Sequence, residues 1–114
     1  MASAPYNRFP SFEDFWPYYV RQHLDPTCRA LHFLGLTLAI GCVALGVLSS
    51  GRYLLLAPIL GYGCSWIGHF VFERNKPASF GNPLLSFFGD VRMWWLMLTG
   101  RMGAHLDAAR GVHL

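Results

Sequence analysis

Two long apolar runs dominate the order of hydrophobic and polar positions along the chain. Arg29 and Arg52 enclose 22 residues without a charge, and Arg52 and Glu73 enclose 20 more. A helix needs about 20 apolar residues to cross the hydrocarbon core of a bilayer, and both runs have that length. A short polar turn that contains Arg52 joins the runs. The pattern therefore predicts a membrane-spanning helical hairpin, with spans at about residues 28–48 and 53–74.

Shorter amphipathic helices are predicted on both sides of the hairpin. Between Ser11 and His23, aromatic and aliphatic residues recur at helical spacing, and Ser11 has the side chain of an N-cap. Pro17 falls inside this segment and is expected to kink the helix or divide it. The tail, residues 100–114, also gathers its apolar residues on one helical face. Both helices suit the membrane interface, or packing against the hairpin.

A third apolar stretch, at about residues 83–99, differs from the two runs because it contains Asp90 and Arg92. Charges in the middle of a span are costly unless they face protein or water. The stretch is therefore expected to be a short re-entrant or interfacial helix, with a third span that carries a functional centre as the alternative. The predicted fold is all-α, an integral membrane hairpin with flanking helices in a single domain over residues 1–114.

Composition favours lipid as the surroundings of the hairpin. Hydrophobic residues make up 54% of the chain and charged residues 13%, about half the charged share of a soluble domain. A pair of buried helices in a soluble bundle is the alternative. Basic residues flank the outer ends of the runs and only Arg52 lies in the turn, so the positive-inside rule predicts a cytoplasmic N-terminus. No separate basic patch with stacking aromatic residues occurs, and no nucleic acid partner is expected.

Histidines gather at one end of the predicted hairpin. His32 lies near the start of the first run and His69 near the end of the second, so an antiparallel hairpin places both at the same membrane face. His23 precedes the first run on that side, which is predicted to be cytoplasmic. Three imidazoles are suitable ligands for iron(II) or zinc, and a catalytic ion keeps positions open for a substrate or for O2. The alternative is that each histidine is an ordinary amphipathic residue of the interface.

Further ionisable groups are expected near these histidines. Glu73 lies four residues after His69 and shares its helix face, and Asp90 returns to the same level if its segment is re-entrant. His105 lies on the apolar face of the tail helix, as a fourth ligand or as a partner of the ligands. The predicted site thus has two carboxylates with a catalytic role, Glu73 and Asp90, and four metal-binding histidines, His23, His32, His69 and His105.

Two other functions are compatible with this pattern. A non-catalytic assembly or lipid-binding module would use the histidines only as anchors at the interface. A proton or ion pathway would use Asp90, Arg92 and the histidines, and it would require a homo-oligomer because two spans offer little wall for a pore. The sequence contains no G-x-S-x-G nucleophile elbow and no H-E-x-x-H zinc motif.

Two parts of the sequence resemble one known family. The first, RQHLDPTCRALHFLG, contains His23 and His32 nine residues apart. The second, GYGCSWIGHFVFERNKPASF, contains His69 and Glu73, and the segments GDVRM and TGRM follow it. From about Phe12 to Met102, these motifs resemble a family of small membrane proteins whose characterised members are iron(II)-dependent dioxygenases of the endoplasmic reticulum.

The resemblance implies an activity and a ligand set. By it, the protein shortens 2-hydroxy fatty acids by one carbon (α-oxidation), with Fe(II) as cofactor and O2 as co-substrate. His23, His32 and His69 match the histidine positions of the family, and Glu73 and Asp90 match acidic positions. The chain looks closer to bacterial members, so the expected location is the bacterial inner membrane, or the endoplasmic reticulum in a eukaryote. The implied partners are the 2-hydroxy fatty acid and membrane lipid.

Overall fold

A computed structural model describes residues 9–77 and 80–111 of the chain. Within these residues the structure has helices and no β-strand, which confirms the all-α fold class. In chain order the elements are α1 (Phe12–Arg21), α2 (Pro26–Leu48), α3 (Tyr53–Ile67), the π-helix η1 (Gly68–Glu73), α4 (Pro83–Leu98) and α5 (Met102–Ala109).

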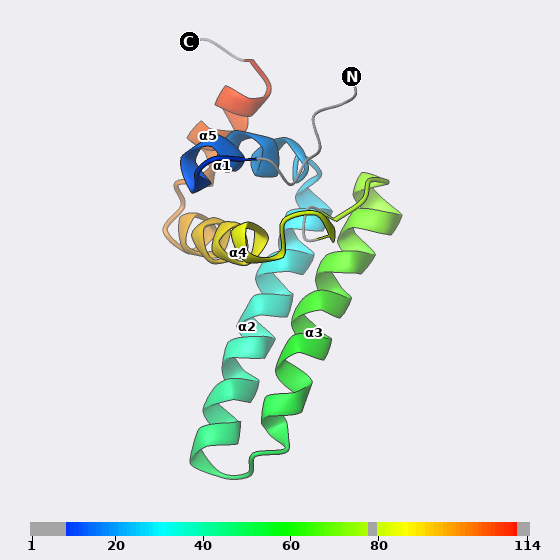
Figure 1. Cartoon of the computed structure of the whole chain (residues 1–114), viewed down its shortest axis with the longest axis vertical. Helices are drawn as coiled ribbons and strands as arrows, with labels where there is room; N and C mark the ends of the chain where they lie inside the picture. Colours follow the sequence, from blue (N-terminus) through cyan, green and yellow to red (C-terminus); the bar gives the residue numbers. More distant parts are fainter. Residues whose placement is uncertain (1–8, 78–79, 112–114) are drawn as a thin grey trace.

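Helices α2 and α3 form the antiparallel hairpin, and η1 continues α3 as far as Glu73 (Figure 1). Helix α2 begins at Pro26 rather than at residue 28, because proline suits a first helical turn and the Asp25 carboxylate accepts two backbone N–H groups of that turn. Both arms of the hairpin are long and apolar enough to cross a membrane, as the sequence predicted.

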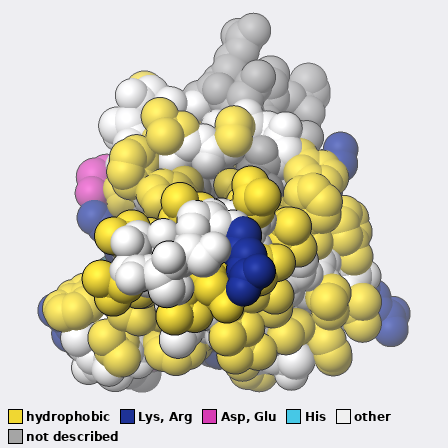
Figure 2. Space-filling model, turned by 90° about the horizontal axis from the view of Figure 1, so that it is seen from below, with side chains coloured by type: hydrophobic (Ala, Val, Ile, Leu, Met, Phe, Trp, Pro, Cys, Tyr) yellow, Lys and Arg dark blue, Asp and Glu magenta, His cyan; other side chains and the backbone are white. Residues whose placement is uncertain are grey.

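Most of the hairpin surface is apolar and is not covered by the rest of the chain. Within the 18-residue apolar segment of α2, only 17% is buried. Within the corresponding segment of the second arm, Tyr53–Glu73, 22% is buried. Figure 2 shows many hydrophobic side chains on the surface of the molecule, seen from the turn end of the hairpin. The core helix of a soluble protein is mostly buried, whereas contiguous apolar surface of this extent is typical of contact with lipid or another protein.

Helices α1, α4 and α5 form a cap over the open end of the hairpin (Figure 1). The apolar stripe predicted for α1 and the apolar face predicted for α5 turn inward and pack with α4. The predicted tail helix ends at Ala109, and residues 112–114 lie outside the described part of the chain. The core of the cap consists of Phe15, Trp16, Tyr19, Val20, Met93, Leu96, Met102 and Leu106.

Helix α1 is continuous although Pro17 lies inside it, so of the two expected effects of Pro17, a kink or a division, the division does not occur. Proline leaves the carbonyl four residues earlier without its helical hydrogen bond. Pro17 is on the exposed side of α1, where water can bond to that carbonyl, while the buried side packs into the core of the cap. Ser11 is the N-cap as predicted, and its hydroxyl accepts the N–H of Asp14.

Helix α4 lies across the hairpin instead of alongside it (Figure 1). It has 16 residues, fewer than the ~20 needed to cross a bilayer, and the expectation of a short interfacial or re-entrant helix fits it better than a third span. Its Trp94 ring stacks on Phe33 of α2, and the indole N–H donates to the Thr37 hydroxyl at 2.9 Å. These contacts fix α4 to the first arm of the hairpin.

The close packing of α2 on α3 gives a testable prediction. A Cβ added at Gly35 would lie 2.8 Å from the Cβ of Cys64 and 3.0 Å from the carbonyl oxygen of Gly61. Gly35→Ala should therefore force the arms apart and lower the free energy of unfolding by about 1–3 kcal/mol.

Gly41→Ala is the matched control for this prediction, because a Cβ at Gly41 meets no other atom within 4 Å. It should leave stability unchanged or raise it by up to about 1 kcal/mol through helix propensity. Thermal unfolding in detergent micelles, followed by circular dichroism, measures both variants. Equal midpoints for the two would contradict the predicted contact.

Candidate metal centre

Three histidines meet where the cap joins the hairpin. His23 follows the end of α1, His32 lies in α2 and His69 lies in η1, and all three are buried. The Nε2 atom of His23 is 3.1 Å from that of His32 and 2.9 Å from that of His69. One ring nitrogen from each residue lies within 4.8 Å of the other two. The structure thus brings together the three histidines that hairpin topology predicted to converge.

Each of these imidazoles is oriented by a hydrogen bond at its other nitrogen. The Nδ1 of His23 faces the backbone oxygen of Tyr19 at 2.6 Å, and that of His32 faces the oxygen of Cys28 at 2.8 Å. The Nδ1 of His69 faces the Oδ1 of Asn75 at 2.6 Å. Carbonyl oxygens only accept, so each Nδ1 carries a proton, and in the neutral ring each Nε2 keeps a lone pair.

Three lone pairs therefore face one another in a buried space, an arrangement that a bound cation stabilises. Two nitrogen ligands bound at about 2.1 Å and at right angles to each other lie about 3.0 Å apart. The two Nε2 separations of 2.9 and 3.1 Å agree with this value. Neutral imidazoles whose second nitrogen donates to a carbonyl are the usual form of metal-binding histidines. The donor set fits a divalent transition metal such as iron or zinc.

Electrostatics keep His23 in the form that binds a metal. Burial lowers the pKa of His23 well below its ordinary value, and the neighbouring His32 and His69 lower this pKa further. The ring is consequently neutral at physiological pH, with its Nε2 free to donate electrons to an ion. The loop that carries His23 is fixed by Arg29, whose guanidinium donates to the backbone oxygens of His23 at 2.9 Å and Leu24 at 2.7 Å.

The π-helix η1 places His69 beside α2. Its Gly68 lies so close to α2 that an added Cβ would be 3.0 Å from the Sγ of Cys28 and 3.1 Å from the Cα of that residue. The segment ends at Arg74, whose φ of 59° is in the left-handed region and turns the chain back. Helices of this wide type occur mostly as short segments, frequently at functional sites.

Asn75 connects this turn to the first cap helix. Its backbone N–H donates to the oxygen of His69 at 3.0 Å, and its side-chain Nδ2 donates to Gln22 at the backbone oxygen (3.1 Å) and at Oε1 (3.0 Å). These donations leave Oδ1 as the atom that faces His69, which fixes the orientation of the amide. Asn75 therefore sets both the tautomer of His69 and its position relative to His23.

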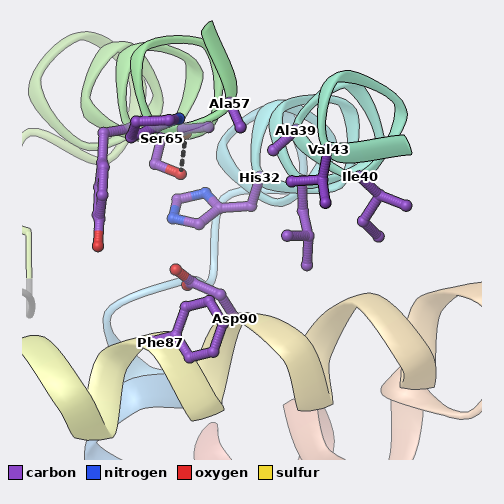
Figure 3. Close-up of a pocket in the computed structure, with 12 residues that line it drawn as sticks. His32, Ala39, Ile40, Val43, Ala57, Ser65, Phe87 and Asp90 are labelled. Carbon is purple, nitrogen blue, oxygen red and sulfur yellow. Dashed lines mark hydrogen bonds between the residues drawn. The ribbon is translucent and has the colours of Figure 1, made fainter. Parts of the chain in front are cut away.

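Asp90 lies beside the three histidines and is linked to them through Tyr19. The Tyr19 hydroxyl donates to the Asp90 carboxylate, and the Tyr19 ring stacks on His23 with centroids 4.0 Å apart. Gly89 permits this approach, since a Cβ there would be 2.8 Å from the Tyr19 ring. Figure 3 shows the Asp90 carboxylate directed toward the ring of His32.

The two groups of the Tyr19–Asp90 pair differ in how firmly they keep a proton. Burial raises the pKa of Asp90 to about 7, although the hydrogen bond from Tyr19 acts in the opposite direction. Burial and the charge of Asp90 raise the pKa of the Tyr19 hydroxyl well above its ordinary value. Tyr19 is therefore a permanent hydrogen-bond donor, whereas Asp90 is a carboxyl group that exchanges a proton near neutrality.

The other two predicted site residues lie outside the cluster of three histidines. Glu73 accepts the backbone N–H of Asp25 and so joins the end of η1 to the start of α2. His105 belongs to α5, and its Nδ1 accepts the indole N–H of Trp16 at 3.0 Å. The structure thus places Glu73 at a helix junction and His105 in the cap, and it does not bring His105 to the predicted ligands.

Two residues that position the histidines were not among the predicted site residues. Tyr19 precedes His23 by four positions, a spacing that puts both on one helix face. This spacing could have identified Tyr19 as a neighbour of His23, whereas the apolar pattern indicates only that Tyr19 belongs to the buried stripe of α1. Asn75 follows the end of a helix, and its contact with His69 depends on the left-handed turn at Arg74, which no sequence pattern predicted.

Removing the amide of Asn75 should weaken metal binding while the ligands remain. We expect Asn75→Ala to lower the affinity for iron(II) by about 10–100-fold, because the ring of His69 loses the acceptor that orients it. Anaerobic competition against a chromophoric chelator measures this affinity. Lys76→Ala, at an exposed neighbouring position, is the control and should bind as the unchanged protein does. Equal affinities for both variants would contradict the role of Asn75.

Comparison with known proteins adds a family to this geometry. The family model for 2-hydroxy-palmitic acid dioxygenase Mpo1-like proteins matches residues 9–102, a range that includes the three clustered histidines and Asp90. No curated protein and no solved structure matches the chain. Since the match extends over most of the sequence, the chain belongs to the 2-hydroxy-palmitic acid dioxygenase Mpo1-like family.

Proposed function

We propose that this protein is a membrane-embedded, iron(II)-dependent dioxygenase that shortens 2-hydroxy fatty acids by one carbon. The observation that carries the proposal is the convergence of three buried imidazoles, with the Nε2 of His23 2.9 and 3.1 Å from those of His69 and His32. Membership of a family described as 2-hydroxy-palmitic acid dioxygenases supports the class of substrate and the use of O2.

The choice of iron over zinc comes from the reaction and not from the ligands. Three histidines suit either ion. An ion of iron(II) bound by His23, His32 and His69 would supply the redox chemistry that a reaction with O2 requires and that zinc lacks. Three protein ligands also leave coordination positions for the substrate, whose hydroxyl and carboxylate can both coordinate a metal.

The surrounding residues contribute binding and orientation. Asp90 is the acidic group that lines the space beside the histidines, and we assign it the hydrogen bond from the 2-hydroxyl of the substrate. Tyr19 keeps that carboxylate in place by donating to it, and burial of the cluster excludes water from the reacting groups. Glu73 acts at a distance, by fixing η1 against the start of α2.

The proposed topology has two membrane spans with the cap in the cytoplasm. The uncovered apolar surface of the hairpin supports the spans, and the basic residues support the orientation, because only Arg52 lies at the turn end. The metal centre then lies at the cytoplasmic interface, where an amphiphilic acid presents its carboxylate. The bacterial inner membrane, or the endoplasmic reticulum in a eukaryote, provides this setting.

Substitution of each ligand tests the proposed function. We expect His23→Ala, His32→Ala and His69→Ala to lose the iron that the anaerobically purified protein retains, and to lower turnover of 2-hydroxy-palmitic acid by more than about 100-fold. Iron content, oxygen uptake and the appearance of the fatty acid one carbon shorter are the measurements. His105→Asn is the control, because it keeps an acceptor for Trp16 and lies outside the cluster.

The outcomes of this experiment distinguish an iron dioxygenase from a zinc protein and from a protein that binds no metal. Near-stoichiometric iron that only the cluster variants lose, together with the shortened product, supports the dioxygenase. Zinc in place of iron, with no oxygen uptake, would overturn the proposed chemistry while leaving the ligands in place. Folded protein without any bound metal would overturn the metal centre and favour a non-catalytic lipid-binding module.

A further inference from the structure

An apolar cavity of about 470 Å³ lies between α2 and α3, on the side where α4 crosses the hairpin (Figure 3). Along α2 it extends from His32 to Val43, a distance of about 16 Å at the rise of an α-helix. Ala57 and Pro58 of α3 line the end of the cavity farthest from the histidines, and Phe87 of α4 lines the near end. The cavity is therefore long and apolar in its outer part, and it is partly open at the surface, where Ile40 and Val43 are 47% and 45% exposed.

A second, much smaller space of about 10 Å³ lies directly at the histidines. It is lined by His23, His32 and His69 and by groups of the cap. Four residues line both spaces, so the long cavity adjoins the small one: His32, Tyr62, Ser65 and Asp90. Together the two spaces are polar at the histidines and apolar along the hairpin.

Ser86 supplies an independent indication that a polar group binds at the inner end of this site. Hydroxyls in helices usually bond to the carbonyl four residues earlier, as those of Thr37, Ser65 and Thr99 do here. The Ser86 side chain is buried, at 3% exposure, and its Oγ has no hydrogen-bond partner among the described residues. It lines the small space beside the histidines, one helical turn before Asp90.

A buried hydroxyl without a partner is costly, and a ligand that accepts its hydrogen bond removes this cost. We infer that this site binds one single-chain amphiphile, with its polar head between the histidines and Ser86 and its alkyl chain along α2 toward Val43. Ser86 Oγ donates to the head group, and the far end of the cavity limits the length of the chain. The identity of the amphiphile as a 2-hydroxy fatty acid rests on the proposed function.

Ser86→Ala distinguishes a ligand-binding hydroxyl from a structural one. Because the Oγ has no hydrogen-bond partner in the described part of the chain, its removal should leave thermal stability unchanged or raise it, while affinity for 2-hydroxy-palmitic acid falls about tenfold. Displacement of a fluorescent fatty acid from the full-length protein in lipid nanodiscs measures affinity, without any need for turnover. Ser49→Ala is the control and should bind normally, because the Ser49 hydroxyl donates to the backbone oxygen of Leu45 at the other end of the hairpin. A loss of stability without a loss of affinity would overturn the role of Ser86.

The position of the alkyl chain is tested with a 2-hydroxy fatty acid that carries a photoreactive diazirine near its end. Crosslinks should map to the lining residues Ile40, Val43 and Ala57 and should disappear when unlabelled 2-hydroxy acid competes. Crosslinks confined to uncovered positions such as Val47 or Leu55, 74% and 72% exposed, would overturn the inference even if turnover is normal. Competed crosslinks in the cavity of a protein without turnover would support the site and contradict only the proposed reaction.

A substitution at the far end tests the limit on chain length. Val43→Phe should shorten the preferred 2-hydroxy acid and reduce the preference for long over short chains about tenfold in affinity. Val47→Phe is the matched control, one turn farther along α2 and outside the lining of the cavity. An unchanged length preference in Val43→Phe, or the same change in both variants, would overturn the assignment of this cavity to the alkyl chain.

Discussion

The hydrogen bonds at the Nδ1 atoms of His23, His32 and His69 determine the orientation of the three imidazole rings where the cap meets the hairpin. Each bond assigns one proton and thereby turns one lone pair toward the centre. Two of the acceptors are carbonyls of the helical turn before the histidine, so His23 and His32 are oriented by their own helices. The third acceptor is a side chain, and it reaches His69 only because the chain reverses after η1.

The cap and the hairpin have different kinds of interior, and the candidate metal centre lies between them. The cap has a core of aromatic and aliphatic residues, whereas the hairpin buries little and relies on close contact between its two arms. Glycines at Gly35, Gly68 and Gly89 permit the close approaches that align these parts. The same hairpin that exposes apolar side chains outward also lines an apolar cavity that adjoins the space at the histidines.

Much of the fold could be predicted from the sequence because a few strong constraints determine it. Runs of 22 and 20 residues without a charge give the length of the hairpin arms, and antiparallel topology then brings His32 and His69 to one level. His105 shows the limit of this reasoning. Helical periodicity placed it correctly on a buried face, but which residue of α1 it meets depends on the packing angle of two cap helices, and that residue is Trp16. Ser86 was not predicted either, because a hydroxyl that lacks a partner among the described residues is recognised only from its three-dimensional surroundings.

The three ligands come from segments that belong to different parts of the molecule. His23 belongs to the cap, while His32 and His69 belong to the two arms of the hairpin. An ion bound to all three would therefore crosslink the cap and the hairpin, and its binding free energy would add to the stability of their association. Without the ion, the lone pairs repel one another at this junction and favour its opening. The supply of the bound metal would then affect the lifetime of the folded protein as well as the occupancy of the site.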